Sequence, residues 1–295
     1  MQRFSIFSLC FMLWAATLPA QGYLDEVRER MEFLQKDPTY TSLTEALANP
    51  EAVKILNLSK KDLRELPATI GLLKNLHTLN LSGNRLRELP ESIGRLSNLR
   101  ILIVSSNKKL RALPNSLGEL HKLELLDVYG NRLRELPESI GQLKKLHTLQ
   151  VGYNRLRELP SNICQIDSLT LLYAYGNKLR YIPSCVGQMQ TLRRIRLSKN
   201  KLDHLPADLG GWQAVTELHL YKNKLRELPH TLADTPQLVR LDLSYNPLRQ
   251  LPEVLGRMPQ LELLFWWKPK IPAEAQRGLQ IQLPNTRIQW EAQRD

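Results

Sequence analysis

A unit of 23 residues recurs along this chain of 295 residues, and its fixed spacing constrains the fold more than any other feature. Successive units start at Val53, Leu76, Leu99, Leu123, Leu146, Leu169, Leu192, Val215 and Leu238, and a truncated tenth unit starts at Leu261. Only the third unit is longer, because it carries one extra lysine within residues 107–110. A period of roughly 20–50 residues is typical of solenoids, in which each unit buries its apolar side against its neighbours. We therefore expect a stack of similar turns.

Each unit has a strand-like part followed by a turn. Leu76, Leu79 and Leu81 have the spacing of a strand with one buried side, so neighbouring units are expected to pair as parallel strands. A Leu-Pro pair later in each unit, replaced by Ile182-Pro183 in one of them, holds the backbone extended, and a short helical or irregular return along the convex side should follow it. An asparagine follows each strand, and its inward amide can satisfy backbone groups there. These asparagines are Asn84, Asn107, Asn131, Asn154, Asn177, Asn200, Asn223 and Asn246.

The unit resembles the short leucine-rich repeat written LxxLxLxxNxLxxLPxxIGxLxx. This form occurs in plant intracellular Ras-group repeat proteins, in animal scaffold proteins and in many bacterial proteins. The resemblance covers about residues 40–290. It implies an α/β fold: a right-handed, horseshoe-shaped leucine-rich-repeat solenoid with a parallel sheet on the concave side and a helical cap at each end.

The caps and repeats predict the domain organisation. Residues 21–52 are expected to form an N-terminal helical cap, with helical spacing between residues 23 and 34 and a capping box from Ser42 to Glu45. Residues 53–260 hold nine repeats. Residues 261–295 hold the partial tenth repeat and a C-terminal cap, with a helix within 271–284 and a strand-like segment at 286–290. Because both ends are typical of caps, we expect a complete array that forms one domain.

Residues 1–20 are predicted to be a signal peptide. Arg3 precedes a short apolar run, and the small residue Ala20 ends the segment. The run is shorter than the roughly 20 apolar residues of a membrane-spanning helix. We expect cleavage before Gln21, and a mature protein that is exported to the periplasm, the cell surface or the medium and has no membrane span. An uncleaved anchor is the alternative.

The composition is that of an ordinary globular protein, with 42% apolar and 24% charged residues, which excludes disorder for most of the chain. The six histidines form no motif with neighbouring acidic residues, and no HExxH, GxSxG or P-loop string occurs. An enzyme needs an acid, a base or a nucleophile clustered in a pocket. We therefore predict no catalytic residues, no metal ligands and no cofactor.

Three cysteines exclude a four-cysteine zinc site. Cys164 and Cys185 lie in adjacent units on the convex side, two positions out of phase. A disulfide requires Cα atoms within about 7 Å. We expect two free, partly covered thiols, and a disulfide formed in an oxidising compartment is the alternative.

The concave face is where the units differ from one another. Side chains two, four and six positions after the start of a unit should point away from the core. Early units carry small polar or aliphatic residues there, such as Asn57 and Ser82, whereas later units carry aromatic and charged residues. Tyrosine and arginine are enriched in binding hot spots, although strands also favour aromatic residues for their own packing. We predict a partner-binding site at Tyr129, Tyr173, Tyr175, Arg194, Arg196, His219 and Tyr221.

Two rows of basic residues flank the leucine that follows each asparagine, and we call them together the cationic edge. Residues 53–260 hold 32 basic and 18 acidic side chains. Glutamates beside the arginines can offset repulsion within the edge. The first row is Arg85, Arg132, Arg155, Lys178, Lys201 and Lys224; the second row is Arg64, Arg87, Arg111, Arg134, Arg157, Arg180, Arg226 and Arg249.

These patterns favour an exported, non-catalytic protein that binds another protein through its concave face and is a monomer. Binding of an anionic surface polysaccharide through the cationic edge is one alternative, and a self-associating structural component of the cell envelope is another. Nucleic acid is not expected as a partner, because export and the interleaved glutamates both argue against contacts that follow a phosphate backbone.

Overall fold

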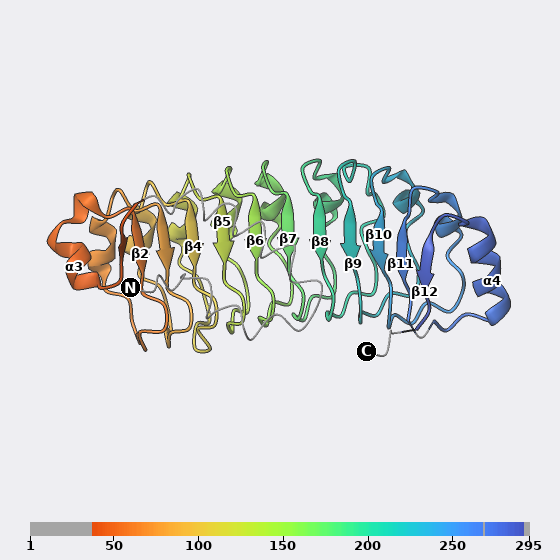
Figure 1. The fold of residues 1–295 in the computed structure, drawn as a ribbon, viewed down its shortest axis with the longest axis horizontal. Coiled ribbons are helices and arrows are strands. Elements are labelled where there is room, and N and C mark those ends of the chain that lie inside the picture. Colours follow the sequence, from red (N-terminus) through yellow and green to blue (C-terminus); the bar gives the residue numbers. More distant parts are fainter. Residues whose placement is uncertain (1–36, 268, 292–295) are drawn as a thin grey trace, which may run out of the picture.

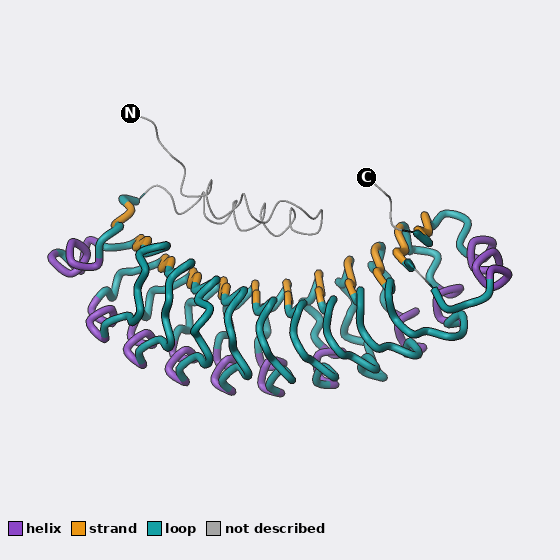
Figure 2. The backbone as a smooth tube through the Cα atoms, turned by 90° about the horizontal axis from the view of Figure 1, so that it is seen from below, coloured by secondary structure: helices purple, strands orange, loops and turns teal. Residues whose placement is uncertain are grey.

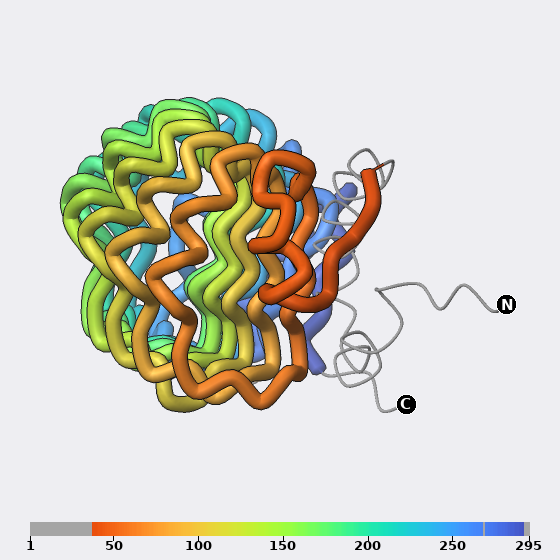
Figure 3. The backbone as a smooth tube through the Cα atoms, turned by 90° about the vertical axis from the view of Figure 1, so that its left-hand side faces the viewer, coloured from red at the N-terminus to blue at the C-terminus, as the bar shows by residue number. Residues whose placement is uncertain are grey.

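The computed structural model describes residues 37–267 and 269–291. The predicted signal peptide and the predicted helix between residues 23 and 34 lie outside these residues. The described part is a curved solenoid whose strands line the concave side (Figure 2). A view along the solenoid axis shows that successive turns of the chain stack on one another (Figure 3).

One parallel sheet of 12 strands runs through the described residues, in the order of the sequence from β1 to β12 (Figure 1). Each regular strand begins two residues after its unit starts, as the apolar alternation predicts. The strands are β1 (Thr39–Tyr40), β2 (Ile55–Asn57), β3 (Thr78–Asn80), β4 (Ile101–Ile103), β5 (Leu125–Asp127), β6 (Thr148–Gln150), β7 (Leu171–Tyr173), β8 (Arg194–Arg196), β9 (Glu217–His219), β10 (Arg240–Asp242), β11 (Leu263–Phe265) and β12 (Arg287–Gln289).

Short 3₁₀ helices form most of the convex side. Those of the repeats start directly after the proline of the Leu-Pro pair, because proline fixes φ and has no N–H to leave unsatisfied at a helix start. The predicted short helical return is confirmed by these segments. They are η2 (Pro50–Ala52), η3 (Ala68–Leu72), η4 (Glu91–Arg95), η5 (Asn115–Glu119), η6 (Glu138–Gln142), η7 (Ser161–Gln165), η8 (Ser184–Gln188), η9 (His230–Asp234) and η10 (Glu253–Arg257).

A helix lies near each end of the described solenoid. Helix α3 (Leu43–Ala48) begins at Ser42, whose Oγ accepts a hydrogen bond from the Glu45 N–H, so the predicted N-cap is present. At the other end, α4 (Ala273–Gln282) follows the last full unit and β12 pairs with β11. The helix and strand expected near residues 271–290 are therefore both observed.

The leucines of the repeat fill one continuous core, and the asparagines close its edge. Leu126, Leu149 and Leu172, for example, are 0% exposed. The Asn154 Nδ2 donates to the carbonyls of Val128 and Val151 at 2.9 and 3.0 Å, and its Oδ1 accepts from the Leu133 N–H at 3.0 Å. Each buried asparagine thus replaces backbone partners that have left the ladder, as expected.

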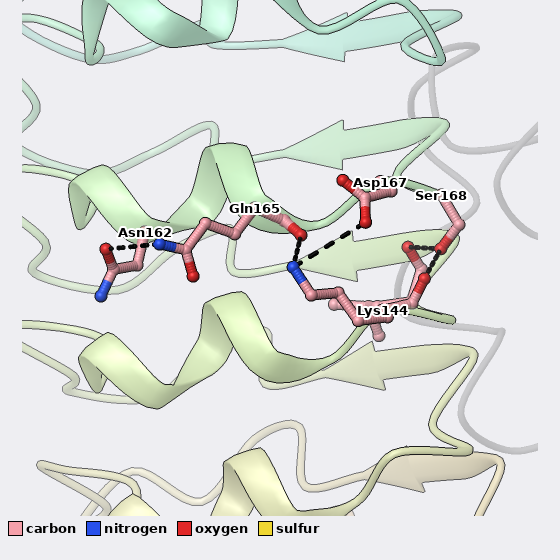
Figure 4. A network of polar contacts seen from close by, with 6 residues as sticks. Lys144, Asn162, Gln165, Asp167 and Ser168 are labelled. Carbon is pink, nitrogen blue, oxygen red and sulfur yellow. Dashed lines mark hydrogen bonds and ion pairs between the residues drawn. The ribbon is translucent and has the colours of Figure 1, made fainter.

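Polar contacts also join neighbouring units outside the core (Figure 4). The Lys144 Nζ donates to the Gln165 carbonyl and lies 3.8 Å from the Asp167 carboxylate. The Ser168 hydroxyl donates to the Lys144 carbonyl at 2.7 Å. These contacts connect the unit that starts at Leu123 with the one that starts at Leu146.

The unit that starts at Leu192 departs from the others, because no 3₁₀ helix lies between β8 and β9 in the described chain. Trp212 is fully buried there, and its Nε1 donates to the Val186 carbonyl at 2.9 Å. A Cβ on Gly211 would lie 2.1 Å from the backbone carbon of Gln188. Only glycine allows the two backbones to approach this closely.

The expectation of two free thiols is wrong, because Cys164 and Cys185 form a disulfide. Cys164 lies in η7 and Cys185 in η8, and their Cα atoms are 6.0 Å apart. The two-residue difference in phase does not prevent the bond, because the offset along neighbouring convex segments still leaves a Cα separation typical of disulfides.

Candidate binding surface on the concave face

Strand register places the predicted site residues on neighbouring strands. Tyr173 on β7 pairs with Arg196 on β8, and Arg196 pairs with His219 on β9. Arg194 lies two residues before Arg196 on the same strand and the same face. The other three, Tyr129, Tyr175 and Tyr221, each follow a strand by two residues and continue the same alternation. The structure therefore brings all seven residues to one side of the sheet, between β5 and β9.

An apolar patch forms the N-terminal part of this surface. Ile101, Leu125, Leu171 and Tyr173 make a cluster separate from the main core, and Ile103 and Tyr175 pack against it. Tyr173 is 0% exposed, so its ring stabilises this layer of side chains. The guanidinium of Arg196 lies over the Tyr173 ring, 4.9 Å from its centroid, and Arg196 is 9% exposed. These two side chains are thus more deeply buried than an outward position on an open sheet implies.

A charged cluster around Glu217 continues the surface toward the C-terminus. One Glu217 oxygen lies 3.5 Å from Arg194 and 3.6 Å from Arg240, and the other lies 3.8 Å from Arg196 and 3.5 Å from His219. One carboxylate therefore faces three guanidinium groups and an imidazole on three adjacent strands. The cluster has excess positive charge, which suits an acidic group on a partner.

The same contacts explain the ionisation of Glu217. Hydrogen bonding from His219, helped by the charges of Arg194 and Arg196, lowers the pKa of Glu217 to about 2 although burial opposes this shift. Asp242 on β10 shows the opposite behaviour, because burial raises its pKa above the ordinary value. Its Oδ1 accepts a hydrogen bond from the Ser244 N–H, so this carboxylate supports the backbone after the strand.

Two aromatic clusters lie where the strands end. In the first, the rings of Tyr129, Tyr153 and Tyr175 contact one another with centroids 5.4 to 6.1 Å apart. The Lys199 Nζ donates to the Tyr153 hydroxyl at 3.0 Å. Burial raises the pKa of Tyr175, so this phenol stays protonated. Tyr153 is 41% exposed, which leaves part of the first cluster accessible.

In the second cluster, the ring centroid of Tyr221 lies 5.2 Å from that of Tyr245 and 6.4 Å from that of Trp267. The Phe265 ring contacts the Trp267 ring. Phe265 and Trp267 are absent from the predicted site. They occupy the fourth and sixth positions after Leu261, which are concave positions in the other units. The register of the truncated tenth unit therefore predicts both residues for the concave face.

Tyr153 and Tyr245 have a backbone conformation that is uncommon for large residues. Their φ values are 49° and 57°, and glycine occupies the equivalent position in three other units, at Gly83, Gly130 and Gly176. A bulky residue with positive φ carries conformational strain. Contacts with the surrounding residues therefore hold these two tyrosines in a backbone conformation of higher energy.

Within the described residues, no group of three histidine, cysteine, aspartate or glutamate side chains is arranged to hold a metal ion. In the same part of the chain, no helix has the length and apolarity needed to cross a bilayer. The described surface therefore consists of aromatic, aliphatic and charged side chains on a sheet.

Family models agree with this architecture. A model described as a leucine-rich repeat region matches residues 42–131 and 115–199, and a model described as a leucine rich repeat matches residues 190–248. Together they cover more than half of the sequence. The chain belongs to the leucine-rich repeat family. No curated protein matches this leucine-rich repeat chain in sequence.

Solved structures share the leucine-rich repeat fold. The functional domain of InlJ from Listeria monocytogenes, which includes a cysteine ladder, has a TM-score of 0.68 and 22% identity over 86% of this chain and 52% of that chain. The plant peptide hormone receptor RGFR1, in complex with RGF2, has a TM-score of 0.63 and 24% identity over 86% of this chain and 50% of that chain. The internalin inlF from Listeria monocytogenes has a TM-score of 0.59 and 21% identity, with 84% and 83% covered.

This chain thus spans about half the length of the InlJ and RGFR1 chains. At these identities, the likeness establishes the fold of the repeats. What the surface of this leucine-rich repeat protein binds has to be argued from its own side chains.

Proposed function

We propose that this protein is an exported, non-catalytic binding protein that recognises another protein through its concave face. Leucine-rich repeat proteins are in general protein-interaction modules. The observation that carries the proposal is the position of the two aromatic clusters directly beside the Glu217 cluster, on adjacent strands of one face. Aromatic rings can bury area at low entropic cost, and arginines can form paired hydrogen bonds with a carboxylate.

The disulfide supports export. Disulfides persist in oxidising compartments and are rare in the reducing cytosol. Cys164 and Cys185 belong to the described repeats, so the bond would form in the folded array. Intact-mass measurement of the exported protein should give a chain that begins at Gln21, and a soluble species that retains Met1 would contradict this proposal.

The concave surface can be tested with a partner captured by the mature chain from its native envelope. We expect Tyr175→Ala and Arg194→Ala each to weaken the complex by more than about 1 kcal/mol, the usual threshold for an interface residue that matters. Arg196 is a poorer choice for this test, because it is buried and its guanidinium lies over the Tyr173 ring.

Matched controls come from the same register. Ser59 and Ser105 occupy the position of Tyr175 in earlier units, and their replacement by alanine should leave affinity unchanged. If all four variants bind alike in calorimetry, the partner does not use this face. Binding through aromatic area should persist at high salt, and sedimentation should show a monomer in the absence of partner.

A further inference from the structure

The two rows of the cationic edge lie in the turns that follow the strands from β2 to β10. In its first row, Arg132, Arg155 and Lys178 are all exposed. The leucine directly after each of them is fully buried. Because that leucine anchors the chain in the core, the basic residues on either side of it point away from the core.

Backbone hydrogen bonds hold the first row in register from unit to unit. Each N–H of the row donates to the carbonyl of the leucine in the preceding unit, as between parallel strands, so the backbone positions that carry the cations are about 4.8 Å apart. The pairs are Arg132 with Leu110 at 2.9 Å, and Arg155 with Leu133, Lys178 with Leu156, Lys201 with Leu179 and Lys224 with Leu202 at 2.8 Å. The fold therefore sets the spacing of the five backbone positions that carry these cations.

The cationic edge forms few direct ion pairs within the described chain. Of both rows, only Arg85 forms an ion pair there, with Asp62. In the described residues, the glutamates that follow the second row form no direct ion pair with it, so any offset of its charge acts over a longer distance. Glu158 instead accepts a hydrogen bond from the Tyr181 hydroxyl at 2.7 Å. An ordered array of like charges repels itself, and a bound polyanion would relieve this repulsion.

We propose that the cationic edge binds a linear anionic polysaccharide, at a site separate from the concave face. A regular array with one step per repeat fits a polymer with regularly spaced carboxylate or sulfate groups, and arginine can bind such groups through two hydrogen bonds. One exposed aromatic side chain, Tyr181, directly follows the second row, and its hydroxyl donates to Glu158. The disulfide indicates an oxidising compartment, which favours a polysaccharide over a nucleic acid as the polyanion.

The test uses heparin as a defined linear polyanion and isothermal titration calorimetry with the purified chain. The edge variant R132Q/R155Q/K178Q/K201Q should lose at least about tenfold in affinity and show a shallower dependence of affinity on salt, because fewer counterions are exchanged. The control R95Q/K122Q/K145Q/R193Q removes the same charge from exposed sites that precede the strands and lie outside the cationic edge. It should lose less than about threefold.

Two further variants separate the edge from the rest of the protein. R132Q/R155Q and K178Q/K201Q should each show an intermediate loss, with a melting temperature like that of the wild type because the side chains are exposed. Tyr175→Ala should bind heparin like the wild type. The heparin experiment therefore tests the cationic edge separately from the proposed partner site on the concave face. Equal losses in the edge and control variants would overturn the proposal. Single-stranded DNA of equal charge that competes as well as heparin would overturn the assignment to a polysaccharide.

Discussion

Single residues on the concave face show how one carboxylate organises several cations. Glu217 lies within 3.5 to 3.8 Å of Arg194, Arg196, His219 and Arg240, all on β8, β9 or β10. Without it, the guanidinium groups of β8 and β10, on either side of β9, would repel one another. The lowered pKa of Glu217 is the consequence, because the ionised form is favoured in the folded protein.

This ionisation predicts a pH dependence of stability. The folded-state pKa of about 2 lies below the ordinary glutamate value of 4.5, so the unfolded chain takes up the proton first as the pH falls. The contribution of Glu217 is complete above about pH 4.5 and is lost toward pH 2. The difference in unfolding free energy between wild type and Glu217→Gln should therefore shrink across this window in denaturant titrations. Burial of Asp242 acts in the opposite direction but is present in both proteins.

Glu253→Gln provides the matched control for this experiment, because it removes one exposed negative charge from η10. A difference between wild type and Glu217→Gln that stays constant down to about pH 2 would contradict the role assigned to the cluster.

Among the structural elements, η7 and η8 mark the point where the regular convex side changes. They lie just before the unit that lacks a 3₁₀ helix, and the Cys164–Cys185 disulfide joins them. In a solenoid each unit is stabilised by its neighbours alone. The disulfide therefore stabilises the part of the array next to the irregular unit, where no contacts with distant units are available.

Removal of this link should be measurable. We expect the double variant C164S/C185S to lose about 3 kcal/mol of unfolding free energy, because the unfolded chain regains the entropy of an open loop. Reductant should cause a similar loss in the wild type and none in the double variant. Equal stability of the wild type with and without reductant would contradict a stabilising role for the bond.

The whole molecule is a chain of coupled units and not a single globular core. Leu149 is fully buried in its unit, and Leu149→Ala should cost about 2–5 kcal/mol. Because each unit is stabilised only by contacts with its neighbours, the rate of amide hydrogen exchange should rise on one side of the substituted unit. This increase should become smaller with distance from that unit. Leu72, which is 55% exposed on the convex side, provides a control whose replacement should change little. Weak and even protection along the whole array would contradict this view.

Much of this architecture could be read from the period of the sequence. The alternation of leucines predicts strand positions, because a slip of one residue would turn every leucine to the solvent. The Leu-Pro pair predicts the convex turn, Asn154 and its equivalents predict the closed edge, and Ser42 predicts the start of α3. These features are local and repeated, so each unit carries the same information.

Contacts between different units could not be read in this way. The Cys164–Cys185 bond depends on the distance and rotation between neighbouring turns. The same holds for the contacts of Glu217 with Arg194 and Arg240. The period assigns each residue a row and a face, but the direction of a long side chain within its row is set by the neighbours that it packs against.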